Sequence, residues 1–236
     1  MKKGKNSVRI LLLVAGVLLI AAIIFGVFMA FGGSTALSPK GKEMVKEKGA
    51  KVEDVYCNRP TINISLQPYD DFTQKEALRL KEELEKNLSP LLDGRTLCID
   101  VLPNKPLEKS LMNEAGTRYR GDKIINSLAK DADKCHIIIA LTHKDISTKY
   151  KGKPDWGVLG LSLIPKKKAC VVSTFRVKNK RDLWKVTSHE FIHTCFNYNH
   201  CPNDNQTCIM KDAKGHADFS NKTKLCEQCS KTINNH

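Results

Sequence analysis

The segment from His189 to His193 has the residue types and the spacing that metal-dependent hydrolysis requires, because it reads His-Glu-Phe-Ile-His. On a helix, two histidines four positions apart lie on one face and can bind the same cation, with Glu190 beside them. Zinc held by neutral imidazoles, with one position open, lowers the pKa of a bound water to about 7. Glu190 can take the proton of that water and pass it to a leaving amine. The segment therefore predicts zinc-dependent hydrolysis, and a pair of hydrogen-bonded core histidines is the alternative.

The flanking sequence favours a mostly buried helix around this segment. Residues 179–182 form a polar opening, and no proline or glycine follows before His193. Apolar side chains are distributed around the predicted helix, at Leu183, Trp184, Val186, Phe191 and Ile192. We therefore expect a helix to hold both histidines and the glutamate.

Further metal-ligating side chains follow the predicted helix. In chain order they are His200, Cys201, Cys208, Cys226 and Cys229, and Met210 lies two residues after Cys208. A pair of cysteines around a two-residue spacer, together with two more near the third histidine, is typical of zinc ligands.

Three histidines, four cysteines and a methionine in this order resemble the archaemetzincin (archaelysin) family of metzincin-clan zinc peptidases. In that family the motif H-E-x-x-H-x-x-G-x-x-H-C binds the catalytic zinc, four cysteines bind a structural zinc, and C-x-M carries the Met-turn beneath the metal. The resemblance implies a zinc peptidase with two zinc ions per chain. The residues that it implies are His189, His193 and His200 as catalytic zinc ligands, Glu190 as general base, Met210 as the Met-turn residue, and Cys201, Cys208, Cys226 and Cys229 as structural zinc ligands.

The loop after the predicted helix departs from the family motif. Phe196 stands at the usual glycine, and six residues instead of five separate His193 from His200, so that Asn199 occupies the usual position of the third ligand. Six residues instead of four also separate Cys201 from Cys208, and fifteen instead of seventeen separate Met210 from Cys226. We interpret these changes as a reshaped loop in which Asn197 ends the helix in a left-handed conformation and His200 reaches the metal.

The upstream sequence predicts an α/β (α+β) fold, in which a metzincin-like mixed sheet packs on helices that include the active-site helix. Strand patterns occur at residues 61–67, 96–102, 136–142, 157–164 and 169–177. Thr73 and Glu76 form a capping box that opens a helix through about Leu88, and a second helix is expected at residues 121–130, after Arg118, Tyr119 and Arg120. The order β-α-β-α-β-β-β-α resembles the upper subdomain of metzincins, and the resemblance covers about residues 60–230.

The predicted strand at residues 157–164 is a candidate for substrate binding. In metzincins an edge strand above the zinc helix pairs with extended substrate, and main-chain pairing suits a peptide or protein substrate. Residues 156–161 are the candidate for that edge, and an ordinary strand within the sheet is the alternative.

The N-terminal sequence predicts one transmembrane helix. Residues 10–31 are 22 residues without a charge, and Lys2, Lys3, Lys5 and Arg9 precede them. The positive-inside rule then places residues 1–9 in the cytoplasm as a tail and the catalytic domain on the extracytoplasmic side, periplasmic or extracellular. We expect a single-pass signal anchor in the cell membrane, a linker at residues 32–55 and a peptidase domain at residues 56–236. A signal peptide cleaved near the small residues 32–36 is the competing interpretation.

The net charge of +14 falls to +10 once residues 1–9 are set aside. The lysines are scattered and no nucleic-acid-binding module is recognisable, so we expect a solvated basic surface and no nucleic-acid partner. The expected partners are a peptide or protein substrate and the membrane, which the N-terminal helix contacts, and the protein is expected to be a monomer.

Nine cysteines in an exported domain would ordinarily indicate disulfides, and the odd number leaves at least one thiol unpaired. Five cysteines have no role in the motifs: Cys57, Cys98, Cys135, Cys170 and Cys195. Cys135 and Cys170 lie in apolar runs and are expected in the core, whereas a bridge between Cys57 and Cys98 stays open.

Two functions of different classes are compatible with these patterns. The first is a membrane-anchored zinc metallopeptidase. The second is a noncatalytic, zinc-stabilised binding module that kept the fold after the third ligand shifted. The presence of Glu190 favours the enzyme, because a structural zinc does not need a general base.

Overall fold

The computed structural model describes residues 60–130, 132, 136–163, 168–213 and 218–235. The chain divides into two units, Met1–Ala50 and Lys51–His236. The predicted tail, anchor and linker, residues 1–9, 10–31 and 32–55, lie outside the described residues. Within the described residues, no helix has both the length and the apolar character needed to cross a bilayer.

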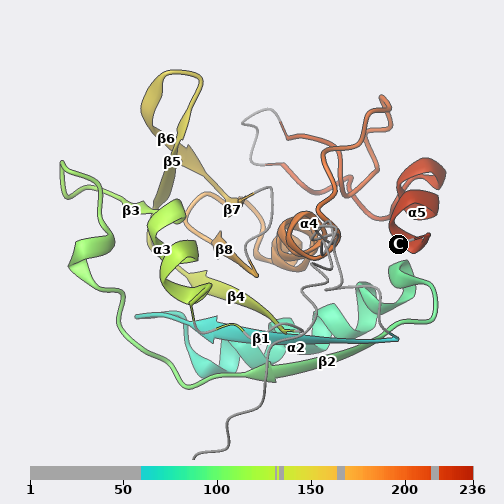
Figure 1. Cartoon of the computed structure of the whole chain (residues 1–236), viewed down its shortest axis with the longest axis horizontal. Helices are drawn as coiled ribbons and strands as arrows, with labels where there is room; N and C mark the ends of the chain where they lie inside the picture. Colours follow the sequence, from blue (N-terminus) through green and yellow to red (C-terminus); the bar gives the residue numbers. More distant parts are fainter. Residues whose placement is uncertain (1–59, 131, 133–135, 164–167, 214–217, 236) are drawn as a thin grey trace, which may run out of the picture. The chain divides into compact units, whose positions relative to one another are not determined.

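A five-stranded mixed sheet is the centre of the fold (Figure 1). Its strand order is β2-β1-β4-β8-β7, with parallel pairing throughout except between β7 and β8. The strands are β1 (Thr61–Pro68), β2 (Thr96–Val101), β4 (His136–Thr142), β7 (Gly160–Ser162) and β8 (Ala169–Ser173). The antiparallel strand β7 therefore forms one edge of this sheet.

Helices cover both faces of the sheet, which explains why the central strand β4 is apolar from Ile137 to Leu141. Ile137, Ile139 and Leu141 face the core beneath α2 and α4, whereas Ile138 and Ala140 face α3. Since both faces are buried, strand alternation brings no polar positions into the run. The helices are α2 (Gln74–Asn87), α3 (Gly121–Leu128), α4 (Leu183–Phe196) and α5 (Glu227–Asn234), with short 3-10 turns at Ser89–Leu92, Lys109–Leu111 and Lys180–Asp182.

The predicted capping box agrees with the structure, whereas one predicted strand is too long. The capping box is present, because the Thr73 hydroxyl accepts from the Glu76 backbone N–H at 3.2 Å and the Glu76 carboxylate accepts from the Thr73 N–H at 2.9 Å. The strand expected at residues 169–177 ends earlier, at Ser173, because Thr174 to Val177 form a turn closed by a backbone hydrogen bond of 3.1 Å.

The strand predicted at residues 157–164 is wrong as a single strand. The first residues of the predicted strand belong to β6, in a second sheet of order β3-β5-β6. The strands of this sheet are β3 (Tyr119–Arg120), β5 (Ile146–Tyr150) and β6 (Lys153–Val158). Gly157 pairs with Ser147 in this sheet, whereas Gly160 pairs with Val172 in the main sheet. The chain therefore changes sheets at Leu159, and residues 156–161 are not one edge strand.

The β5–β6 hairpin was not predicted because its turn lacks the usual sequence signal. Its two-residue turn, Lys151 and Gly152, has positive φ angles of 45° and 79°. Such turns are normally recognised in a sequence by Asn-Gly or Asp-Gly. This turn has lysine at the first position, so the usual signal is missing.

Candidate metal centre and catalytic site

Helix α4 carries His189, Glu190 and His193 in the interior of the domain. These side chains are only 5%, 8% and 6% exposed, respectively. The helix contacts β4, β7 and β8 on one side and is followed by the C-terminal loops. Its buried position requires that each of these polar groups has a partner.

The two helix histidines point their Nε2 atoms at each other, 3.0 Å apart. Their Nδ1 atoms are engaged elsewhere, because His189 donates to the Ile209 carbonyl at 2.8 Å and His193 donates to the Tyr198 carbonyl. In a neutral imidazole a protonated Nδ1 leaves a lone pair on Nε2. Two facing lone pairs repel each other unless a cation lies between them, and two ligands of a tetrahedral zinc are about 3.3 Å apart. This arrangement therefore fits a metal ion.

His200 completes a group of three imidazoles. Its ring centroid lies 4.8 Å from that of His193 and 5.2 Å from that of His189. One ring nitrogen from each of the three histidines lies within 4.8 Å of the others. The loop therefore brings His200 to the group, despite its additional residue.

The end of α4 explains how the loop accommodates that residue. Asn197 adopts a left-handed conformation, with φ 49° and ψ 34°, directly after Phe196 ends the helix. Asparagine tolerates this region better than most residues, so that it replaces the glycine of the family motif.

The environment of the three histidines keeps them neutral. Burial lowers the pKa of His193 to about 4, and burial also lowers the pKa of His189 and His200, with neighbouring histidines as a further cause for His189. Neutral imidazole is the form that binds metal, so these groups are ready ligands at neutral pH.

Glu190 lies against strand β7. The Ser162 hydroxyl donates to its carboxylate Oε2 at 2.8 Å, and Thr194 donates to its backbone carbonyl at 2.9 Å. A Cβ added to Gly160 would come within 2.5 Å of the Glu190 side chain, so glycine is required for this close approach. Burial raises the pKa of Glu190 to about 7, although the hydrogen bond from Ser162 opposes this shift. A carboxylate with such a pKa suits proton transfer near neutral pH.

Met210 is fully buried in the turn that supports His189. The turn is closed by a hydrogen bond of 3.0 Å from the Lys211 N–H to the Cys208 carbonyl. It presents the Ile209 carbonyl to His189, and the Met210 carbonyl accepts from the Cys201 N–H at 2.7 Å. The segment at Met210 thus contributes to both clusters of metal-ligating side chains.

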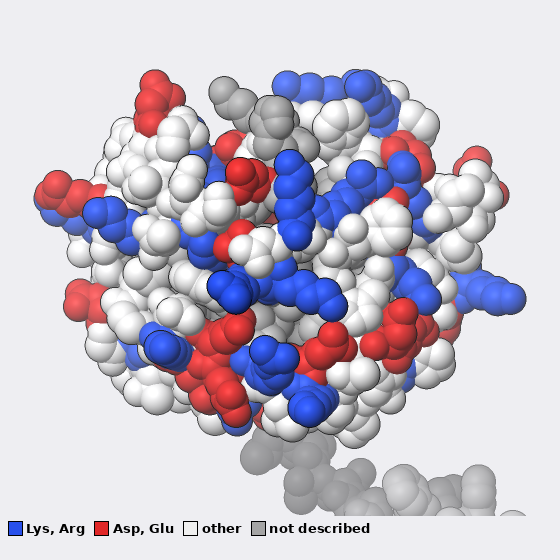
Figure 2. All heavy atoms as spheres, turned by 180° about the vertical axis from the view of Figure 1, so that it is seen from behind, with Lys and Arg blue, Asp and Glu red and all other residues white. Residues whose placement is uncertain are grey.

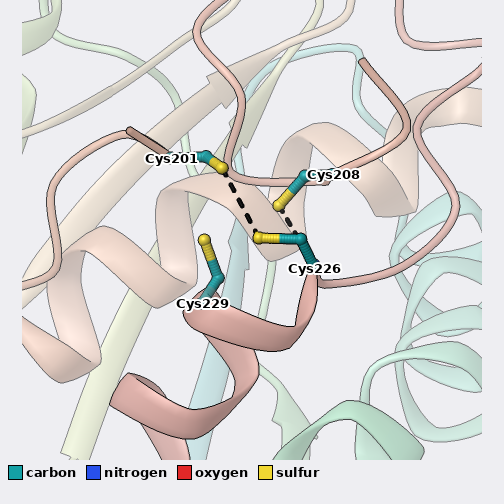
Figure 3. Close-up of side chains that lie close together, drawn as sticks. All are labelled: Cys201, Cys208, Cys226 and Cys229. Carbon is teal, nitrogen blue, oxygen red and sulfur yellow. Dashed lines mark hydrogen bonds between the residues drawn. The ribbon is translucent and has the colours of Figure 1, made fainter. Parts of the chain in front are cut away.

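A second cluster consists of Cys201, Cys208, Cys226 and Cys229, whose side chains converge from two loops and the start of α5 (Figure 3). All four are buried free thiols, and their sulfur atoms lie within 4.8 Å of one another. The Sγ atoms of Cys201 and Cys226 are 3.6 Å apart, close to the separation of about 3.8 Å expected for two sulfurs on a tetrahedral zinc.

One thiol of this cluster is prepared to ionise. Burial raises the pKa of Cys226, but hydrogen bonds from the backbone and side chain of Cys229 and from neighbouring thiols outweigh it and lower the pKa to about 7. Burial instead raises the pKa of Cys208 and of Cys229, so the fit to a structural metal site rests on the four converging sulfur atoms.

Comparison with solved structures identifies the architecture. The archaemetzincin AmzA of Methanopyrus kandleri is similar with a TM-score of 0.61 and 18% identity, over 75% of this chain and 96% of that one. AmzA of Archaeoglobus fulgidus, solved with malonate, gives a TM-score of 0.54 and 20% identity, over 72% of this chain and 99% of that one. The chain has the archaemetzincin fold. The sequence matches no family model and no curated protein significantly.

Within this archaemetzincin fold, Tyr198 joins the two clusters. Its backbone carbonyl accepts from His193, and its hydroxyl donates to the sulfur of Cys229 at 3.3 Å. His200 and Cys201 join them a second time, because consecutive residues enter different clusters. Sequence reasoning did not identify Tyr198, Ser162 or the Ile209 carbonyl; only Gly160 carried a signal, as a glycine inside a strand pattern.

The remaining described cysteines have other environments. Cys98 is exposed and free, so the Cys57–Cys98 bridge that the sequence left open does not form. Cys170 is a buried free thiol beneath α4, as expected for a core residue, and Cys195 is disulfide-bonded. Cys57 and Cys135 lie outside the described residues.

Proposed function

We propose that this protein is a membrane-anchored zinc metallopeptidase in which His189, His193 and His200 bind the catalytic zinc and Glu190 is the general base. The observation that carries the proposal is the pair of facing Nε2 atoms on α4, 3.0 Å apart, with both Nδ1 atoms bonded to backbone carbonyls. Two histidines satisfied in an apolar core would not direct two lone pairs at each other.

The chemistry divides between the metal and the protein. When bound, zinc supplies Lewis acidity that lowers the pKa of water to about 7 and polarises a peptide carbonyl. Glu190 accepts the proton of the attacking water on its carboxylate and transfers it to the leaving amine. Ser162 holds this carboxylate against β7, which limits the positions from which it can accept the proton.

Strand β7 supports an extended peptide or protein as the substrate. It is paired only with β8 among the strands of the described sheet, so its other edge has backbone groups available for pairing. An extended peptide can add to such an edge through main-chain hydrogen bonds. Gly160 brings this edge next to Glu190, where the scissile bond must lie.

The four cysteines would hold a second, structural zinc, which makes two zinc ions per chain. Two observations support this site: the four thiols are buried, free and convergent, and the sulfur atoms of Cys201 and Cys226 are 3.6 Å apart. A closed site of four thiolates leaves no position for substrate, as is usual for structural zinc.

The membrane location rests on the sequence of residues 10–31. An uncleaved helix implies full-length protein in the membrane fraction, with a catalytic domain that external protease can digest. N-terminal sequencing of the mature protein tests this. A chain that begins near Ala36 would establish a cleaved signal peptide instead.

Digestion of a peptide library by the full-length protein in detergent tests the activity. Cleavage should stop in the presence of a zinc chelator and return when zinc is restored, because the open position requires the metal. A protein that binds zinc but cleaves no peptide would favour the noncatalytic binding module.

A matched pair of variants tests the third ligand. His200→Ala should weaken the affinity for the catalytic zinc by about tenfold to a hundredfold or more, because it removes an imidazole from a three-histidine group. Asn199→Ala should change the affinity little. Zinc titration with a competing chelator measures both. Equal, small effects would mean that the third ligand is another residue, for example His216.

A further inference from the structure

The tip of the β5–β6 hairpin carries a basic aromatic surface that peptide hydrolysis does not use. We call its five residues the hairpin patch: Lys149, Tyr150, Lys151, Lys153 and Trp156. All three lysines are exposed, and Tyr150 is 44% exposed. The hairpin projects from the domain beyond the main sheet (Figure 1), and Figure 2 shows Lys and Arg side chains gathered at the upper edge of the molecule over it.

The positive charge of the hairpin patch is not neutralised within the domain. No acidic group in the described part of the chain forms a salt bridge with Lys149, Lys151 or Lys153. The nearby Asp155 pairs instead with Arg118, at 2.9 Å. The patch therefore presents three cations to an outside partner.

The two aromatic rings of the patch are amphipathic groups held beside these cations. The ring centroids of Tyr150 and Trp156 are 5.9 Å apart. The Lys151 ammonium lies 5.3 Å from the Tyr150 ring and the Lys153 ammonium 4.7 Å from the Trp156 ring. Tryptophan and tyrosine prefer the headgroup level of a bilayer, and lysine stems allow the ammonium to remain among the phosphates.

We propose that the hairpin patch docks the catalytic domain on an anionic lipid bilayer. Each lysine near such a surface strengthens binding about fivefold, and the rings add apolar contact at the interface. The proposal deepens the membrane location proposed above and does not depend on the hydrolytic chemistry.

Two other partners fit the hairpin less well. A peptide strand would have to pair with the free edge of β6, but that strand contains Pro154, which has no N–H to donate. Single-stranded nucleic acid would stack its bases on free ring faces, but each ring already has an ammonium group over it.

Docking would supply the orientation that the linker cannot. The 24 residues at positions 32–55 can extend about 80 Å, whereas a domain of this size is about 40 Å across. A tether of that reach leaves every face of the domain free to meet the membrane. A second contact at the hairpin would select one face.

Fluorescence quenching in vesicles tests the proposal with the full-length protein. The chain has two tryptophans, so Trp184→Phe leaves Trp156 as the sole reporter and Trp156→Phe is the matched control. In vesicles that contain phosphatidylglycerol with brominated acyl chains, Trp156 should be quenched relative to unbrominated vesicles, and Trp184 should not. Raising the salt concentration should reverse the quenching, since it screens the lysines.

Replacement of the three lysines by Gln should lower the ratio of docked to undocked Trp156 by about tenfold or more. Peptide hydrolysis in detergent should stay unchanged in this variant, which separates a failure of docking from a failure of the proposed activity. Unquenched Trp156, or equal quenching in phosphatidylcholine alone, would overturn the proposal. A shift of Trp156 emission with RNA but not with vesicles would also overturn it and identify a nucleic-acid partner.

Discussion

Glu190→Gln should lower the rate of peptide hydrolysis by at least about a hundredfold while fold and metal content are retained. The side chain keeps its size, and its amide oxygen can still accept the hydrogen bond from Ser162. An amide cannot take up the proton of the attacking water, so only the proton transfer is lost. Measurements of kcat/KM, zinc content and thermal unfolding on the same preparation separate these effects.

Glu85→Gln is a suitable control, because Glu85 lies on α2 and forms only an exposed ion pair with Lys81, at 3.7 Å. This variant should hydrolyse peptides at the rate of the parent protein. If Glu190→Gln also kept the parent rate, Glu190 would have no part in the mechanism, and the buried histidines would have to serve another purpose.

Cys226→Ser should remove the proposed structural zinc ion and destabilise the C-terminal part of the domain. Cys226 precedes α5, and its sulfur lies 3.6 Å from that of Cys201, so its loss opens the cluster that connects these segments. Structural zinc in small domains contributes about 10 kcal/mol or more to folding, and a domain with its own core should lose a part of that. Metal analysis and thermal unfolding measure the two consequences.

Cys98→Ser is the matched control, because Cys98 is a free and exposed cysteine outside the cluster. It should leave zinc content and unfolding temperature unchanged. A parent protein with one zinc, in which mass spectrometry finds the four cluster cysteines as disulfides, would reject the structural zinc site.

The residues that could be predicted are those whose effect is local. The Thr73 capping box and the uninterrupted apolar run of β4 follow from short-range pattern, and both agree with the structure. The histidines of α4 share a face because helix periodicity dictates it. Asn197 was recognisable as a helix terminator, because few other residues accept its left-handed backbone.

The groups that were not predicted act through the backbone or through distant contacts. The backbone carbonyls of Ile209 and Tyr198 orient two histidines. Every residue has a backbone carbonyl, so the residue type does not show which carbonyl has this role. Ser162 reaches Glu190 only because β7 lies at the sheet edge beside α4, a pairing that no local pattern encodes. The change of sheets at Leu159 was not predicted either, because it also depends on strand pairing between residues that are distant in the sequence.

The bridge at Tyr198 has a consequence for biosynthesis. The Tyr198 carbonyl orients His193, and the Tyr198 side chain is held in place by its hydrogen bond to the sulfur of Cys229. Cys229 leaves the ribosome 31 residues after Tyr198. We therefore expect the proposed catalytic site of a nascent chain to be incomplete until α5 has emerged. Truncated chains that end before Cys226 should be inactive when synthesised in vitro with zinc. If the proposed peptidase activity and export both hold, such late maturation would keep the chain from cutting the translocation machinery while it is being threaded through the membrane.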